Sequence, residues 1–154
     1  MIFILIALIV AVDQLFKSLV TCSMFPGHQY YQIGSFFSLT YVRNKGAAFG
    51  MFSDQAPLLA FVSGAFIAAI IFHLVFSKNQ RLLTNISLAF LLGGSLGNLI
   101  DRFFRGYVVD YIYVTNTPVF NFADIMINAG VGLLILDLFI NSKIGAGLKR
   151  RDRS

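Results

Sequence analysis

Apolar residues along this chain occur in four long segments, separated by shorter stretches that hold most of the polar residues. The second segment, Pro57–Phe76, contains no formally charged side chain and would extend roughly 30 Å as a helix. That length matches the apolar thickness of a bilayer. The pattern therefore predicts an all-α membrane protein with four spanning helices, at about residues 2–21, 57–76, 82–102 and 122–140.

The connection between the first two segments, residues 22–56, is too long for a simple turn. Two runs within it, Tyr30–Ile33 and Phe36–Val42, are rich in aromatic and β-branched residues and flank Gly34-Ser35, a pattern typical of a hairpin. Aromatic side chains at this density suit the level of the lipid headgroups. We therefore expect this first outer loop to form a small extracytoplasmic β-sheet that lies on the membrane surface.

The loop before the fourth segment, residues 103–121, carries an extended run at Tyr107–Val114. After the fourth segment, residues 142–154 form a glycine-containing, basic tail that we expect to be mobile. The tail and the short loop with Lys78 and Arg81 together hold seven of the twelve cations. Because cytoplasmic segments are the ones enriched in lysine and arginine, we expect both termini in the cytoplasm and the other two loops on the outer side.

The composition agrees with a membrane protein and excludes several other classes. The 154 residues are 57% hydrophobic and 12% charged, with a mean hydropathy of +0.76, and a small soluble domain could not hide so much apolar surface. The net charge of +5 comes largely from the tail, which suits an anchor at anionic lipid better than a nucleic-acid groove. One cysteine excludes an intramolecular disulfide, and two isolated histidines give no metal-ligand spacing. We expect one polytopic domain, residues 1–154, without metal, other cofactor or nucleic-acid partner.

The seven acidic residues are all aspartates, and three of them, Asp101, Asp110 and Asp124, lie within residues 93–124. Carboxylates this close to spanning segments are costly unless paired, so each is a functional candidate. Arg102 directly follows Asp101 and should hold it ionised, whereas Asp110 and Asp124 lack an adjacent cation and form the free pair. Two close carboxylates share a proton, so one can act as general base on water while the other donates to a carbonyl. The pattern thus favours peptide hydrolysis without a metal.

Simpler roles remain open for several of these residues. Asp124 stands in the first turn of the fourth segment, where a carboxylate can cap a helix. Arg102 can merely neutralise the aspartate before it. Asp13 and Lys17, four residues apart on one face of the first segment, can neutralise each other. Asp137 lies thirteen residues beyond Asp124, so it should stand near the opposite membrane face and is left out of the site.

The third segment carries a second pattern, of small residues followed by polar ones. Gly93 and Gly97 have the small-xxx-small spacing that allows another helix to approach closely. Asn98, Asp101 and Arg102 follow at helical spacing on one face, and packing does not explain them. We therefore expect the end of this segment to contribute to a site.

Five short motifs resemble, in order, those of one enzyme family. They are DQLFK, which starts at Asp13; NKGAAF, from Asn44; GNLIDR, ending at Arg102; VVDYI, around Asp110; and FNFAD, ending at Asp124. Together they resemble lipoprotein signal peptidase, the aspartic signal peptidase II of bacteria. The resemblance covers nearly the whole chain and rests on several motifs in the right order, so it is more specific than any single aspartate spacing.

The resemblance implies an enzyme of the bacterial cytoplasmic (inner) membrane that cuts diacylglyceryl-modified prolipoproteins just before the lipidated cysteine. It assigns catalysis to Asp110 and Asp124, the pair that the residues alone favour. It further implies a set of residues that bind substrate or orient the pair: Asn44, Asn98, Arg102, Asn121, Asp13 and Lys17. The partners would be prolipoprotein signal peptides and membrane lipid, and the active site of a monomer would lie at the outer face.

Two departures and three rival interpretations accompany this resemblance. Ile125 stands where the family often has a small polar residue, and the link from Asp110 to Asp124 is short. A small transporter or proton channel would need charges spread through the membrane depth, and a non-catalytic assembly factor would give no reason for the unpaired aspartates. A presenilin-like protease would carry Gly-x-Gly-Asp, but Tyr107-Val108-Val109 precedes Asp110.

Overall fold

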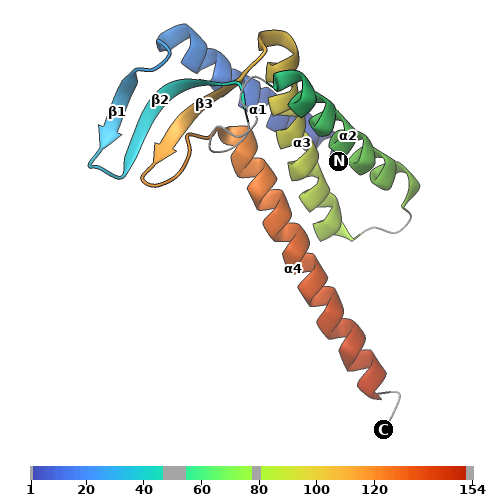
Figure 1. Ribbon diagram of the computed structural model, residues 1–154. Coiled ribbons are helices and arrows are strands. Elements are labelled where there is room, and N and C mark those ends of the chain that lie inside the picture. Colours follow the sequence, from blue (N-terminus) through green and yellow to red (C-terminus); the bar gives the residue numbers. More distant parts are fainter. Residues whose placement is uncertain (1, 47–54, 78–80, 152–154) are drawn as a thin grey trace.

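The computed structural model describes residues 2–46, 55–77 and 81–151, which contain four helices and three strands (Figure 1). In chain order they are α1 (Ile2–Ser23), β1 (Gln29–Ile33), β2 (Phe37–Asn44), α2 (Ala56–Phe76), α3 (Leu82–Arg105), β3 (Val108–Val114) and α4 (Phe122–Arg151). Each of these four helices is long and apolar enough to span a membrane. The predicted helical membrane fold with a small sheet is confirmed.

The central helix of the bundle is α3, which packs against α1, α2 and α4. Its glycines permit this, because a side chain in their place would collide with the neighbouring helices. A Cβ at Gly93 would stand 2.8 Å from Cγ2 of Ile9 on α1, and one at Gly94 would stand 2.5 Å from a carbonyl oxygen of α4. At Gly97 it would collide with the Asp13 carboxylate. The predicted role of these glycines in close helix packing is confirmed.

The apolar side chains divide between a core and the outer faces of the helices. The core joins α1, α2 and α3 through Ile6, Ile67, Ile70, Leu88, Ala89, Leu91 and Leu92. Large apolar side chains also point outward, among them Phe61 and Phe103, which are 74% and 78% exposed. Exposed apolar surface on this scale is unfavourable in water but is the surface that acyl chains contact. The outer faces thus fit a bilayer.

The three strands form one antiparallel sheet in the order β1-β2-β3. The predicted hairpin is present as β1 and β2. β3 comes from the loop before α4 and pairs with β2, so that Val42 lies opposite Asp110 and Asn44 opposite Val108. The sheet therefore draws on two loops and not on the first alone. Figure 1 shows it at the end of the bundle where α1 ends and α4 begins.

Two helices, α3 and α4, extend furthest beyond their predicted bounds. α3 continues past residue 102 to Arg105, and Gly106 ends it with a φ of 75°, in the left-handed region that favours glycine. α4 continues through the predicted tail as far as Arg151, although Gly145 and Gly147 there disfavour a helix. The longer α3 places Arg105 one turn beyond Asp101 on the same face.

Candidate active site

A cavity of about 900 Å³ at the sheet end of the bundle collects most of the predicted site residues. Its lining comes from α2, α3, α4, the strands β2 and β3, and the loop before α4. The predicted residues that line it are Asn44, Asn98, Arg102, Asp110 and Asp124. The remaining three, which are fully buried outside this lining, are Asn121, Asp13 and Lys17. The structure thus separates the predicted residues into a cavity set and a buried set.

Asp110 lies in β3, opposite Val42 of β2, and is only 2% exposed. Its carboxylate accepts a hydrogen bond from Asn44 Nδ2 at 2.8 Å and another from Asn121 Nδ2 at 2.7 Å. These donors favour the ionised form, but burial and then the nearby Asp124 oppose it and raise the pKa of Asp110 from 3.8 to about 7. Asp110 can therefore gain or lose a proton near neutral pH.

Asp124 is the third residue of α4, and its carboxylate takes part in a capping box. The Asp124 amide donates to Asn121 Oδ1 at 3.0 Å, and the Asn121 amide donates to Asp124 Oδ2 at 3.1 Å. The other carboxylate oxygen, Oδ1, accepts a hydrogen bond from Asn98 Nδ2 at 2.8 Å. The capping role that the sequence left open is present, and it holds a carboxylate that also lines the cavity.

Asn121 connects the two aspartates of the cavity. Its Oδ1 accepts from the Asp124 amide, while its Nδ2 donates to Asp110 and, at 3.1 Å, to Asn98 Oδ1. The side chain is fully buried, so these bonds do not compete with water. One short side chain therefore fixes the position of Asp110 relative to Asp124. We call these two aspartates the carboxylate pair.

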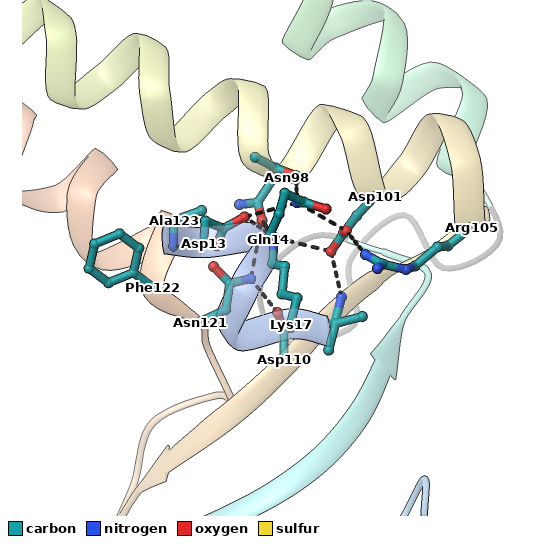
Figure 2. A network of polar contacts seen from close by, with 12 residues as sticks. Asp13, Gln14, Lys17, Asn98, Asp101, Arg105, Asp110, Asn121, Phe122 and Ala123 are labelled. Carbon is teal, nitrogen blue, oxygen red and sulfur yellow. Dashed lines mark hydrogen bonds and ion pairs between the residues drawn. The ribbon is translucent and has the colours of Figure 1, made fainter. Parts of the chain in front are cut away.

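A second group of charges lies beside the carboxylate pair and is shown in Figure 2. We call it the ion cluster, formed by Asp13, Lys17, Asp101 and Arg105. Lys17 Nζ stands 2.9 Å from Asp13 Oδ2 and 3.1 Å from Asp101 Oδ2, and these three side chains are fully buried. Arg105 Nη1 pairs with the other oxygen of Asp101. The neutralisation of Asp13 by Lys17 is thus present, and Lys17 also neutralises an aspartate of α3.

Arg102 is not the ion-pair partner of Asp101, and that prediction was wrong. The partners of Asp101 are Lys17 on α1 and Arg105, one turn further along α3. Successive residues of a helix point about 100° apart, so the side chains of Asp101 and Arg102 diverge. Arg102 lines the cavity together with the carboxylate pair.

The ion cluster also holds the backbone that carries the carboxylate pair. Asp101 Oδ2 accepts a hydrogen bond from the Val109 amide at 3.0 Å, and Asp13 Oδ1 accepts one from the Ala123 amide at 3.1 Å. Val109 and Ala123 are each the residue directly before a member of the carboxylate pair. The two buried aspartates therefore fix the two chain segments from which the cavity aspartates project.

Asn98 provides a third connection between the two groups of charges. Its Oδ1 accepts from Lys17 Nζ at 2.9 Å and from Asn121, while its Nδ2 donates to Asp124. An ammonium has no acceptor to offer, so its contact fixes which end of the Asn98 amide is the oxygen. Lys17 thereby orients the amide that holds Asp124.

Two residues of this network were not among the predicted site residues. Arg105 has a local signal, because it lies four residues after Asp101 at helical spacing. Gln14 Nε2 donates to Asp13 Oδ2 and to the Gly97 carbonyl oxygen, both at 3.1 Å. The second of these bonds joins α1 to α3 through a backbone carbonyl, and no sequence spacing predicts which side chain reaches that oxygen.

The cavity brings together groups suited to acid–base chemistry. Carboxylates line it from β3 and α4, and Arg102 lines it from α3. A water between two carboxylates that share a proton can lose a proton to one while the other donates. Within residues 2–46, 55–77 and 81–151, no three histidine, cysteine or acidic side chains come together as a metal site. Residues 47–49 of the NKGAAF motif lie outside the described residues.

Known proteins are similar to this chain over most of its length. The family model of signal peptidase (SPase) II matches residues 5–140. A lipoprotein signal peptidase of Moorella thermoacetica is 43% identical over 139 residues, or 90% of this chain and 93% of that protein. One of Bacillus subtilis is 38% identical over 151 residues, or 95% of each. A solved bacterial membrane enzyme matches with a TM-score of 0.85 at 28% identity, over 92% of this chain and 88% of the other. This chain therefore belongs to the signal peptidase II family.

Proposed function

We propose that this protein is an aspartic endopeptidase that removes the signal peptide from diacylglyceryl-modified prolipoproteins, cutting just before the lipidated cysteine. Family membership supports action on lipoprotein signal peptides. The observation that carries the aspartic mechanism is the carboxylate pair, Asp110 and Asp124, which line one cavity and are connected by Asn121. Neutral amides satisfy both carboxylates without cancelling their charge, which favours retention of one shared proton.

In this mechanism the carboxylate pair activates a water molecule. The ionised carboxylate takes a proton from the water while the water oxygen attacks the scissile carbonyl carbon. The protonated carboxylate donates its proton to the carbonyl oxygen. The resulting tetrahedral intermediate collapses when a proton passes to the leaving nitrogen and the C–N bond breaks. The proton belongs to the pair, so neither aspartate is assigned as its sole carrier.

The other cavity residues hold the pair or the substrate. Asn44 and Asn98 each donate to one member of the pair, and Asn121 connects both. Arg102 has a planar guanidinium that lines the same cavity, where it can donate to substrate carbonyl groups. We assign substrate contact to Arg102 and positioning of the carboxylate pair to the three asparagines.

Asp13 and Lys17 receive a different role from the one their motif implied. Both side chains are fully buried and lie outside the lining of the cavity. Asp13 binds the Ala123 amide and Lys17 binds Asn98, and both contacts lead to Asp124. We therefore propose that Asp13 and Lys17 position the carboxylate pair and do not touch the substrate.

The orientation that we propose places both termini in the cytoplasm and the cavity at the outer face of the inner membrane. α4 begins at the cavity and runs away from the sheet to the basic end at Arg151 (Figure 1). Arg81 also lies away from the sheet (Figure 1), 3.9 Å from Asp137 of α4. Cytoplasmic ends are the ones enriched in such cations. A cavity between helices at the outer face would accept both the signal helix and the lipid from within the bilayer.

The test compares isosteric changes at three aspartates. Asp110→Asn and Asp124→Asn keep the side-chain shape but lose the base and the shared proton, so each should reduce cleavage by about 10³-fold. Asp137→Asn is the matched control, because Asp137 lies thirteen residues beyond Asp124 along α4 and outside the cavity. Cleavage of a lipidated precursor is measured in vesicles that contain equal amounts of each variant.

Cleavage by Asp110→Asn or Asp124→Asn within about tenfold of the control rate would remove that residue from catalysis. A precursor whose cysteine lacks the lipid tests the substrate separately. Equal cleavage of both precursors by the wild-type enzyme would overturn the requirement for the diacylglyceryl group while leaving the aspartic mechanism in place.

A further inference from the structure

A second cavity, of about 360 Å³, lies between the end of α1, strand β2 and the end of α3. Its lining consists of residues 21–26, at and just beyond the end of α1, together with Tyr41, Arg43, Arg105 and Tyr107. It shares no lining residue with the cavity of the carboxylate pair. The peptidase mechanism therefore makes no use of it.

Arg43 is held over this second cavity by aromatic rings. Its guanidinium carbon lies 5.1 Å from the ring centroid of Tyr107 and 5.8 Å from that of Tyr41, and its Nε donates to Tyr41 Oη at 3.4 Å. The two phenol hydroxyls also share a hydrogen bond, at 3.3 Å. No carboxylate among the described residues pairs with Arg43, so its terminal N–H groups are available to a ligand. A guanidinium stacked in this way is oriented before a ligand arrives.

The charge of the second cavity is positive. Arg105 lines it as well, and although one of its nitrogens pairs with Asp101, the guanidinium has four further N–H donors. Neither aspartate nor glutamate is among the lining residues. Ser23 adds a hydroxyl. Such a set of donors without an acceptor charge suits an anion with several oxygens, and the arginine fork binds phosphate through two parallel hydrogen bonds.

The position of the second cavity along the bundle indicates the source of that phosphate. α1 ends at Ser23 and α3 ends at Arg105, and both helices are candidate spans that stop at the cavity. The end of a span is the level of the lipid headgroups, where tyrosine side chains are enriched at both membrane faces and where a long arginine side chain can reach a lipid phosphate. This placement holds whichever membrane face the sheet occupies.

We propose that the second cavity binds the phosphate group of an anionic phospholipid, with Arg43 as the main contact. This site is separate from the carboxylate pair and does not depend on the proposed peptidase activity. It would tie the β2 strand, and with it the neighbouring Asn44, to the lipid surface.

The single cysteine of the chain offers a direct readout, because Cys22 lines this cavity and is exposed. The rate at which N-ethylmaleimide alkylates Cys22 is measured for the full chain in an uncharged detergent, with increasing dihexanoyl phosphatidylglycerol. The lipid should slow alkylation of the wild type. Arg43→Gln should raise the lipid concentration needed for half protection by at least about tenfold, since it removes a charge-assisted contact.

Lys45→Gln is the matched control, because it removes the same charge two residues further on but at a position outside the lining. It should be protected like the wild type. Failure of the lipid to protect the wild type, or equal protection of Arg43→Gln, would overturn the proposal.

Two further ligands identify the source of the phosphate. Inorganic phosphate at the same concentration should protect much less than the lipid, and equal protection would reassign the site to a free anion. Dihexanoyl phosphatidylcholine carries the same phosphate with a compensating cation, so it should protect less than phosphatidylglycerol. Equal protection by both lipids would overturn the selection for an anionic headgroup.

Discussion

The ion cluster and the carboxylate pair each contain two buried or partly buried aspartates, but their carboxylates bind different donors. In the ion cluster, Asp13 and Asp101 contact Lys17 and Arg105, whose charges cancel theirs. In the carboxylate pair, the side-chain donors are the neutral amides of asparagines. A cation cancels the charge of a carboxylate, whereas an amide satisfies its oxygens and leaves the charge in place. The kind of donor, more than burial, therefore separates aspartates suited to structure from aspartates suited to proton transfer.

The largest loss of stability is expected from Lys17→Met, which removes the central cation of the ion cluster. Asp13 is left without a cation and Asp101 with Arg105 alone, which should lower the free energy of unfolding by about 3–5 kcal/mol. We expect a large loss of folded protein, measured as the monodisperse fraction after extraction from membranes. The double change Lys17→Met with Asp13→Asn removes the unpaired charge and should restore part of that fraction. Equal fractions for the single and double variants would contradict this account.

Substitution of the two arginines at the end of α3 should affect different properties, namely cleavage for Arg102 and stability for Arg105. Arg102→Gln should reduce cleavage about 100-fold with little change in Tm, because the guanidinium lines the cavity and has no ion-pair partner among the described residues. Arg105→Gln should chiefly lower the free energy of unfolding, by roughly 1–2 kcal/mol, because it leaves Asp101 with one cation. Both cleavage and thermal unfolding are measured for each variant. A lower Tm in Arg102→Gln than in Arg105→Gln would place Arg102 in the ion cluster after all.

The pH dependence of cleavage tests whether the carboxylate pair needs its proton. The pKa of Asp110 is about 7, so the pair should lose the proton that one member donates as the pH rises above that value. Cleavage should then fall by about tenfold for each further pH unit. Rates are measured in vesicles equilibrated at a series of pH values, with vesicle integrity checked at each. A rate that stays constant to about two pH units above the pKa would show that no such proton is required.

The smallest effect concerns the pH dependence of stability. The pKa of Asp110 is raised above 3.8 in the folded chain, so between about pH 4 and 7 the folded chain binds a proton that the unfolded chain has released. The contribution of this group to the free energy of unfolding therefore falls as the pH rises through that window. Asp110→Asn does not titrate, so its Tm relative to the wild type should rise by a few degrees across the same window. A difference in Tm that does not change with pH would contradict the raised pKa.

Hydropathy predicted the helices because a spanning helix is a local and uniform pattern. The predicted segment 57–76 and the observed α2, Ala56–Phe76, differ by one residue. The β1–β2 hairpin was also local. The pairing of β2 with β3 joins strands from two loops, and its register, such as Val42 opposite Asp110, depends on how the bundle brings these loops together.

The candidate site likewise divides into features with a local sequence signal and features that depend on contacts between distant segments. Motifs in order drew attention to the aspartates and asparagines that line the cavity. The mistaken partner of Asp101 followed from setting the end of the third span at residue 102, because Arg105 then fell outside the helix that aligns it. The bonds from the Val109 and Ala123 amides to the ion cluster had no sequence signal, since every residue except proline carries the same donor.

The hydrogen bond from the Ala123 amide to Asp13 bears on the order in which the molecule assembles during synthesis. α1 leaves the ribosome first and α4 last, so the Asp13 carboxylate lacks this donor until the final helix docks. Asp124 directly follows Ala123, and the same docking step brings it beside Asp110. Under the proposed mechanism, a partly inserted chain therefore has only one member of the carboxylate pair in place. Such an enzyme is expected to be inactive during its own synthesis and to become competent only when insertion is complete.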